Sequence, residues 1–450
     1  MTEHDAAAEA PGGAGAPSRA FTSEPRDPMT EHDAAAEAPG GAGAPSRAFT
    51  SEPRDPMTEH DAAAEAPVHH EVPSPEPPAQ HRLPGPDVVR AAALIGVVVM
   101  NYHGYLIIRG GQQGDDRVDR FFDPWDGPLS TRFAATFVLV AGVGVTLLTR
   151  ARAADRAAIT SMRWRLARRG LLLYVTGLVF DTVWAGTILP FYGAMFAVAA
   201  VIVTWSSRWV LTLGGMTAVA GAAIAWWRFE QELSGHSTAW LADGQRSPRA
   251  LLLDVFVNGT HPLLPWLAFF TAGIVLGRLL GSTLHGSNLL GSILLGSPRW
   301  RPAALGVGTT LWVAATLVSG IVSSSDTGSG VATLLASADP FDRGVVYTAS
   351  ALGTALVAFA AISWIADRHA GRPAVEVLRV AGQMSLTLYV LHALLFNLLV
   401  DWWGWVRPTG LDTALAFAVA YWTVGLIAAW LWSRRFDRGP LEIVYRRLTA

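Results

Sequence analysis

Residues 88–108 read VVRAAALIGVVVMNYHGYLII, and this stretch decides the class of the protein. An α-helix needs about 20 apolar residues to cross the roughly 30 Å of hydrocarbon in a bilayer. The stretch has this length, and the two side chains that interrupt its apolar character most, Arg90 and His103, stand toward its ends. It therefore predicts a transmembrane helix.

The composition extends this prediction to most of the chain. Of the 450 residues, 51% are hydrophobic and 16% are charged, whereas about 25% are charged in a typical soluble domain. Nine further apolar stretches follow, at roughly 131–149, 168–187, 188–204, 209–227, 262–280, 303–323, 345–366, 378–400 and 413–432. We therefore expect an all-α, polytopic membrane helix bundle of about ten transmembrane helices, with a tight reversal at 187–190 between the third and the fourth.

The arginines predict how the bundle is oriented. All 34 basic residues are arginine, and if the N-terminus is cytoplasmic the inner segments hold 21 of them and the outer loops nine. Cytoplasmic loops are enriched in basic residues, so this alternation places both termini in the cytoplasm.

Two segments are predicted to lie outside the packed bundle. Residues 1–28 and 29–56 are identical, and a third copy begins at Met57. These repeats are rich in Ala, Gly, Pro and Glu, so we expect residues 1–80 to be a disordered tail and 81–450 to form the membrane domain. Residues 279–298 are four leucine-containing pentapeptides. A five-residue period builds no single helical face, which favours a flexible or interfacial cytoplasmic loop.

Several chemistries are excluded by the residue inventory. The chain has no cysteine and no lysine. It therefore lacks disulfides, thiolate metal sites, a cysteine nucleophile and a Schiff-base lysine. We find no Walker A, GxSxG or dinucleotide-binding fingerprint, and the near-zero net charge predicts no nucleic-acid partner.

Ionisable groups inside membrane helices are costly and usually functional. Asp87 and Arg90 are three residues apart, so they share a helix face and can form an ion pair. Four further groups fall in the predicted outer half of the membrane: His103, Asp181, His261 and His392. Histidines at similar depth fit a metal site or an acid/base centre, and because no metal-ligand spacing is present, proton transfer is the better interpretation.

A basic segment, residues 150–169, precedes the third helix. It contains Arg163, Arg165, Arg168 and Arg169. These side chains fit either a phosphorylated cofactor or a plain anchor on anionic lipid. In the sixth helix, Gly273 and Gly277 form a GxxxG motif, which favours close helix packing.

The order of the motifs resembles a known family. Arg82-Leu-Pro-Gly-Pro-Asp87-Val-Val-Arg90, followed by an apolar helix ending Asn101-Tyr-His103, is similar to the opening of the heparan-alpha-glucosaminide N-acetyltransferase-like family. Trp125-Asp-Gly and the following apolar run resemble its second helix. The segments 261–278 and 382–389 are similar to parts of related bacterial multi-pass proteins. The resemblance covers about residues 82 to 435.

The resemblance implies an acyltransferase in the plasma membrane, as in the inner membrane of a bacterium. Members take an acyl group from acyl-CoA on the cytosolic side and deliver it to an acceptor on the far side, a terminal glucosamine in the named enzyme. A histidine in or near the first outer loop is implicated. Phe122-Asp123 occupy that position here, and the nearest histidine is His103.

The site expected from the residues and the resemblance has three parts. His103 would be the catalytic base, oriented by Asp123 or Asp181, with Asn101 or His392 as donor to the oxyanion. The arginines expected to bind the phosphates of acyl-CoA are Arg90, Arg163, Arg165, Arg168 and Arg169. The residues expected to contact the acceptor are Trp125, His261 and Tyr389.

The expected ligands follow from these assignments. They are acetyl-CoA or another acyl-CoA as donor, an envelope glycan or lipid as acceptor, membrane lipids and a second copy of the chain. No metal is expected. A proton-coupled transporter or exporter is the alternative function, although no inverted repeat with matching broken helices is found. A non-enzymatic membrane scaffold is a third alternative.

Overall fold

The computed structural model describes residues 84–149, 156–241, 247–285, 300–324 and 330–449. The predicted tail, residues 1–80, and most of the pentapeptide segment lie outside these residues. Where the chain is described it is helical and contains no strand.

Fifteen α-helices and four short 3₁₀- or π-helices make up the described chain. In order they are α1 (Gly85–Ile108), α2 (Arg117–Phe121), α3 (Arg132–Thr149), α4 (Arg156–Asp181), α5 (Leu189–Ile202), α6 (Ser207–Leu233), η2 (Ala239–Leu241), α7 (Pro248–Leu253), η3 (Asp254–Asn258), α8 (Leu263–His285), α9 (Trp300–Ser323), α10 (Gly330–Ala336), η4 (Pro340–Asp342), α11 (Val345–Arg368), α12 (Pro373–Gln383), α13 (Ser385–Phe396), η5 (Asn397–Trp402), α14 (Leu411–Ser433) and α15 (Pro440–Leu448).

The helices confirm a polytopic membrane protein. Eight spans in the described residues are long and apolar enough to cross a bilayer: α1, α3, α6, α8, α9, α11, α13 with η5, and α14. Among the predicted stretches, the third and fourth correspond to α4, which is arginine-rich at its start, and to α5, which is short. The total of ten spans stays a prediction.

Three boundaries differ from the sequence prediction. The basic segment expected as a loop is largely helical, because α4 already begins at Arg156; arginine favours helix and needs no loop to stay solvated. The ninth apolar stretch is divided at Met384, where the backbone leaves the helical region between α12 and α13. Apolar periodicity does not reveal such a turn. In addition, α8 runs to His285, past the start of the predicted loop.

The expected reversal between the third and fourth stretches is confirmed. Helix α4 ends at Asp181 and α5 begins at Leu189, and the two pack against each other along their lengths. Pro190 occupies the first turn of α5, where the missing N–H costs no helical hydrogen bond.

Close packing of α3 and α8 confirms the role expected of the GxxxG motif. An ideal Cβ on Gly273 would lie 2.0 Å from the carbonyl oxygen of Leu139 in α3. The side chain of Thr146 donates to the carbonyl of Ile274 at 2.8 Å. The absence of a side chain at Gly273 therefore lets the two backbones touch.

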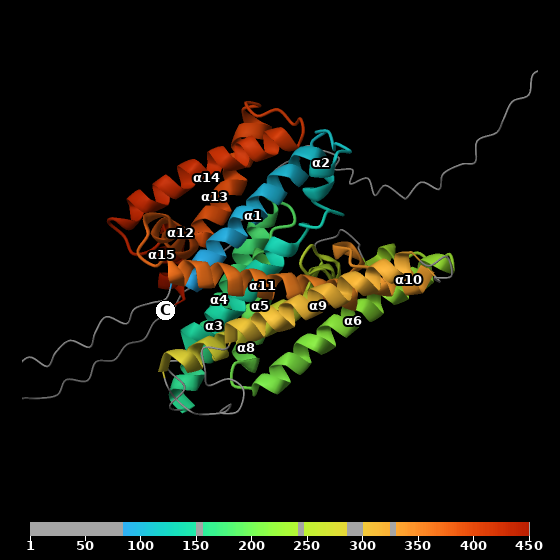
Figure 1. Cartoon of the computed structure of the whole chain (residues 1–450), viewed down its shortest axis with the longest axis horizontal. Helices are drawn as coiled ribbons and strands as arrows, with labels where there is room; N and C mark the ends of the chain where they lie inside the picture. Colours follow the sequence, from blue (N-terminus) through green and yellow to red (C-terminus); the bar gives the residue numbers. More distant parts are fainter. Residues whose placement is uncertain (1–83, 150–155, 242–246, 286–299, 325–329, 450) are drawn as a thin grey trace, which may run out of the picture. The chain divides into compact units, whose positions relative to one another are not determined.

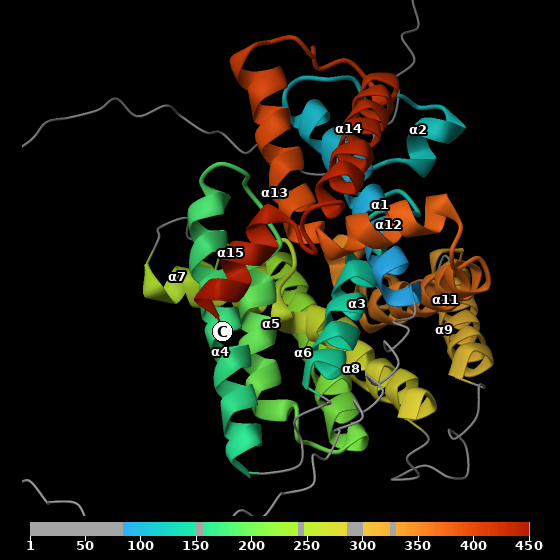
Figure 2. The same ribbon diagram turned by 90° about the vertical axis from the view of Figure 1, so that its left-hand side faces the viewer.

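Helix α1 lies at the centre of the described bundle. It packs against α3, α11, α12, α13 and α14, and Figures 1 and 2 show it running beside α13 and α14. Leu94, Val98 and Tyr102 are fully buried. The helix that was expected to hold the site is thus enclosed by protein on most sides.

We expect Gly273→Val to lower the midpoint of thermal unfolding. Its Cβ would collide with the backbone of α3, and overpacking costs about 1–3 kcal/mol or more. Gly306→Val in α9 is the matched control, because nothing lies near the Cβ position of Gly306. Thermal unfolding of the protein purified in detergent measures both. Equal midpoints for the two variants would contradict the contact.

Candidate functional site

Asn101 and His103, near the C-terminal end of α1, form hydrogen bonds with different parts of the protein. Side chains on an α-helix are about 100° apart per residue, so Asn101 and His103 point about 200° apart. Asn101 bonds to His392 of α13, whereas His103 bonds to the backbone of Phe122, in the connection between α2 and α3. The predicted site therefore divides into two parts, one on each side of α1.

His103 has the arrangement of an oriented base. Its side chain is 1% exposed, and Nδ1 lies 2.8 Å from the carbonyl oxygen of Phe122. A carbonyl can only accept, so Nδ1 carries the proton and Nε2 of the neutral ring carries the lone pair. Nε2 is buried and has no hydrogen-bond partner in the described structure. A buried polar atom without a partner is rare and needs an explanation, such as a catalytic role.

Asp123 holds the loop that orients His103. Its Oδ1 accepts from the backbone N–H of Trp125 at 2.8 Å and of Asp126 at 2.9 Å, and Gln113 donates to Oδ2. This pattern is an Asx turn, which fixes the backbone beside Phe122. The carboxylate expected to orient His103 thus acts on the loop, and the carbonyl of Phe122 contacts the ring.

His392 uses both ring nitrogens. Nδ2 of Asn101 lies 3.2 Å from Nε2, and Nδ1 contacts the carbonyl of Tyr389 in the preceding turn. Since an amide nitrogen donates and a carbonyl accepts, Nε2 is the unprotonated nitrogen and Nδ1 the protonated one. Tyr102 donates to the carbonyl of His392 at 3.0 Å. His392 therefore holds α1 against α13.

Tyr389 and Asp181 both stabilise the turn between α4 and α5. The hydroxyl of Tyr389 lies 3.0 Å from Thr187 Oγ1 and accepts from the N–H of Ile188 at 3.2 Å. Asp181 accepts from the N–H of Gly186 at 2.9 Å. Neither group shares a hydrogen bond with His103.

His261 lies just before α8. Its Nδ1 is 2.8 Å from Thr260 Oγ1, and its ring meets Trp266 edge-on at 4.5 Å between centroids. Burial lowers the pKa of His261 far below its ordinary value, and the positive charge of Arg343 lowers it further. The ring is therefore neutral at physiological pH and packs as an aromatic group.

The structure joins some predicted residues and separates others. His103, Asp123 and Trp125 belong to one part, and Asn101, His392 and Tyr389 to the other. His261 shares no hydrogen bond with either part in the described residues, although Thr260 beside it bonds Gly186 in the turn that Asp181 holds. No three His, Asp or Glu side chains in the described ranges converge as metal ligands would.

The start of α1 carries the predicted ion pair. Arg90 Nη1 lies 3.3 Å from Asp87 Oδ1 and 3.5 Å from the carbonyl of Gly382, and Gln383 donates to Asp87 Oδ2 at 2.9 Å. An ideal Cβ on Gly382 would lie 1.8 Å from the carbonyl oxygen of Asp87, so α12 reaches this place because Gly382 has no side chain. Along α1, Arg90 and His103 are roughly 20 Å apart, at 1.5 Å per residue.

The four predicted arginines of α4 have different surroundings. Arg163 donates to Thr204 at 2.7 Å, and Arg169 contacts Thr449 and the ring of Tyr445. Arg165 has a buried Nε without a partner in the described residues, and Arg168 is exposed. Together they make this end of the bundle basic, but they do not converge on one site.

Three polar groups near the predicted residues were not predicted from the sequence: the carbonyl of Phe122, the side chain of Gln383 and the hydroxyl of Tyr192. Phe122 acts through its backbone carbonyl, which leaves no side-chain signal. Gln383 stands in the segment 382–389 that resembles related proteins, but its partner Asp87 is remote in sequence. The hydroxyl of Tyr192 in α5 is buried without a partner in the described structure.

Comparisons with known families match both parts of the membrane domain. The family model described as heparan-alpha-glucosaminide N-acetyltransferase, catalytic, matches residues 82–306, half of the chain. A second, described as protein of unknown function (DUF418), matches residues 294–450. No curated protein matches the chain. His103 lies in the first match and His392 in the second, so the Asn101–His392 contact joins the two matched segments.

We expect Asp123→Ala to lower the free energy of unfolding by about 1–2 kcal/mol, because the partly buried N–H groups of Trp125 and Asp126 would lose a charged acceptor. Asp123→Asn keeps an oxygen for Trp125 and Asp126 and should lose less. Asp115→Ala, an exposed residue near the same turn, is the control. Thermal unfolding compares the three. If Asn were as damaging as Ala, the negative charge and not the turn would be what matters.

Proposed function

Because the chain belongs to the heparan-alpha-glucosaminide N-acetyltransferase-like family, we propose that it is a membrane-embedded acyltransferase. It transfers an acyl group, acetyl first of all, from cytosolic acyl-CoA to an amine or hydroxyl of a sugar or lipid in the cell envelope. One observation carries the proposal: the buried, partnerless Nε2 of His103 on a ring whose Nδ1 is fixed by a backbone carbonyl.

His103 is the base in this proposal. The acceptor nitrogen or oxygen attacks the thioester carbonyl, and Nε2 takes the acceptor proton as the new bond forms. The carbon–sulfur bond then breaks, and the CoA thiolate takes that proton from Nε2. The carbonyl of Phe122 stays bonded to Nδ1–H and stabilises the positive ring between these steps, the role a carboxylate has in hydrolase triads.

The oxyanion of the tetrahedral intermediate needs a donor on the His103 side of α1. Asn101 and His392 lie on the other side and are retained in the proposal as a positioning pair. Gly96, two turns before His103 and on the same helix face, packs against Phe133 of α3. The residue before Phe133 is Arg132. The Nη1 atom of Arg132 is buried without a partner in the described structure. We therefore favour Arg132 as the donor.

The acyl-CoA donor is assigned to the end where α1 begins. Arg90 lies there with Nη2 beside Gly144 of α3, and a guanidinium suits phosphate oxygens. The arginines at the start of α4 add to the positive charge of that end. The pantetheine arm would then extend along α1 toward His103.

The acceptor is assigned to the loop beside His103. Trp125 is partly exposed in the Asx turn of Asp123, and an indole offers an apolar face for a sugar ring. His261 and Tyr389 are already engaged in packing and hydrogen bonds. In this proposal they stabilise this end of the bundle and do not contact the acceptor. An amino sugar is the acceptor class that the family name points to.

We expect His103→Gln to lower acyl transfer by about 10²- to 10⁴-fold while the protein stays folded, because a general base contributes that much. The assay follows thiol release from acetyl-CoA with a panel of amino sugars. Since the chain has no cysteine, a thiol-reactive dye reports CoA alone. His369→Gln is the matched control, because His369 bonds its own helix at the end of α11. Undiminished transfer in the His103 variant would rule it out as the base.

Acetyl-CoA should raise the stability of the purified protein, by about 2.7 kcal/mol at 100 times its dissociation constant. ATP serves as the phosphate control. Arg90→Gln should weaken the effect of acetyl-CoA, whereas Arg372→Gln, an exposed arginine at the start of α12, should not. No stabilisation by acetyl-CoA or free CoA would favour the transporter alternative, which predicts flux that depends on a proton gradient.

A further inference from the structure

The short C-terminal helix α15 is fixed to the bundle at several points. The carboxylate of Glu442 accepts from the N–H groups of Leu386 and Thr387 at 2.7 and 3.1 Å, and from the Thr387 hydroxyl at 2.5 Å. Tyr445 donates to the carbonyl of Arg169 in α4 at 3.2 Å. Helix α15 thus bridges the start of α13 and α4, as Figure 2 shows. Its orientation is set by these contacts.

The connection from α14 to α15 is also held. The indole N–H of Trp432 donates to the carbonyl of Arg438 at 2.8 Å, and its ring stacks on Phe436 at 4.4 Å between centroids. Helix α14 is a candidate membrane span that ends at Ser433. The connection therefore lies where a spanning helix leaves the hydrocarbon.

Helix α15 is amphipathic. Val444 and Leu448 lie on one face and are 52% and 64% exposed. Arg446 lies on the opposite face, and Ile443 and Arg447 lie on the side between the two, because the residues are about 100° apart around the axis. A short helix with an exposed apolar face and an arginine face, next to the end of a span, has the character of a helix lying in the membrane interface.

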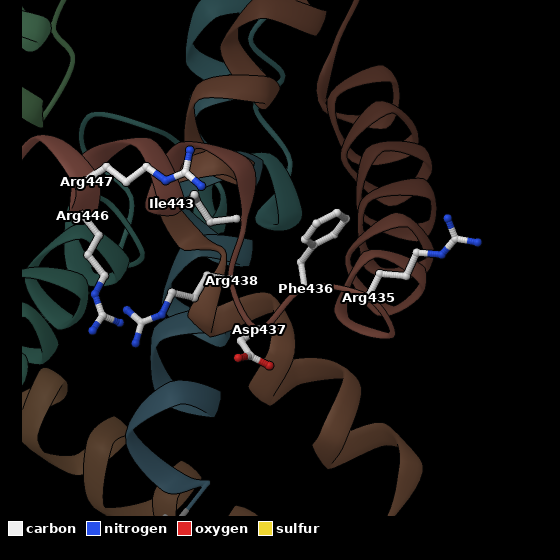
Figure 3. A pocket seen from close by; sticks show the side chains of 7 residues that line it. All are labelled: Arg435, Phe436, Asp437, Arg438, Ile443, Arg446 and Arg447. Carbon is white, nitrogen blue, oxygen red and sulfur yellow. The ribbon is translucent and has the colours of Figure 1, made fainter.

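A cavity of about 480 Å³ opens beside the arginine face. It is lined by Arg435, Phe436, Asp437, Arg438, Ile443, Arg446 and Arg447. Four arginines against one aspartate leave it strongly positive. In Figure 3 the side chains of Arg438 and Arg446 extend to the same side of the view, whereas Arg435 points away on the far side of Phe436.

We propose that this cavity binds the phosphate of an anionic phospholipid headgroup. Guanidinium groups suit phosphate oxygens geometrically and electrostatically, and four of them line the cavity. Phe436 lines the cavity and is exposed, and the exposed Val444 and Leu448 lie on another face of α15. These apolar side chains fit the acyl chains of a lipid and not a soluble nucleotide. Basic pockets at the end of transmembrane helices are typical sites for anionic headgroups. The site uses none of the residues assigned to acyl transfer.

The test uses the full chain purified in neutral detergent. Thermal unfolding is followed during titration with phosphatidylglycerol, and the midpoint shift gives an apparent dissociation constant. Phosphatidylcholine, inorganic phosphate and CoA are the comparison ligands. The variant is Arg438→Gln with Arg446→Gln. The matched control is Arg368→Gln with Arg372→Gln, which removes the same charge from two exposed residues around the end of α11.

Phosphatidylglycerol should stabilise the native chain more than phosphatidylcholine does. The double variant should bind it about 10- to 30-fold more weakly, since each arginine near an anionic headgroup contributes about fivefold. The control should bind as the native chain does, and lysine at both positions should retain most of the binding because the charge is kept. Equal binding by variant and native chain would overturn the proposal. Tighter binding of CoA or inorganic phosphate than of the lipid, lost in the same variant, would overturn the lipid assignment.

Discussion

A polar group buried in a membrane helix must find its partner within the protein, because hydrocarbon offers none. Helix α1 shows the consequence along its whole length. Asp87 and Arg90 pair with each other and with α12, and Asn101 and Tyr102 bond to α13. His103 is satisfied at Nδ1 and left open at Nε2. Against this background of paired groups in α1, the open Nε2 is the observation on which the proposed role of His103 as a base rests.

The sequence predicts the helices better than it predicts the site. Apolar stretches of about 20 residues locate spans because bilayer thickness fixes their length, and the spacing of Asp87 and Arg90 predicts their ion pair. The position of a residue along the membrane normal is not enough to predict the site, because the direction of its side chain around the helix also matters. Histidines at similar depth were expected to gather, but Asn101 and His103 face opposite sides of α1, so their partners belong to different elements. The orienting carbonyl of Phe122 carries no signal in residue type at all.

The two matched segments form one structural unit. Three contacts join α1, in the first match, to α12, α13 and η5, in the second: Asp87 with Gln383, Asn101 with His392, and Arg109 with Asp401. The last is a two-pronged ion pair, with 2.5 and 2.7 Å between its atoms. These contacts lie at the beginning, in the last third and at the end of α1. The segment that carries His103 is therefore aligned by the segment whose family description gives no function.

Helix α13 sets the register of that alignment, and it is fixed at both ends. Glu442 bonds the N–H groups at its start, where the helix dipole favours a carboxylate, and Asp401 bonds Arg109 beyond its other end. Between them, Tyr389 bonds the α4–α5 turn and His392 bonds α1. A shift of α13 along its axis would break contacts at both ends together. The positioning of α1, and with it of His103, thus depends on contacts of α13 that lie far from His103 in the sequence.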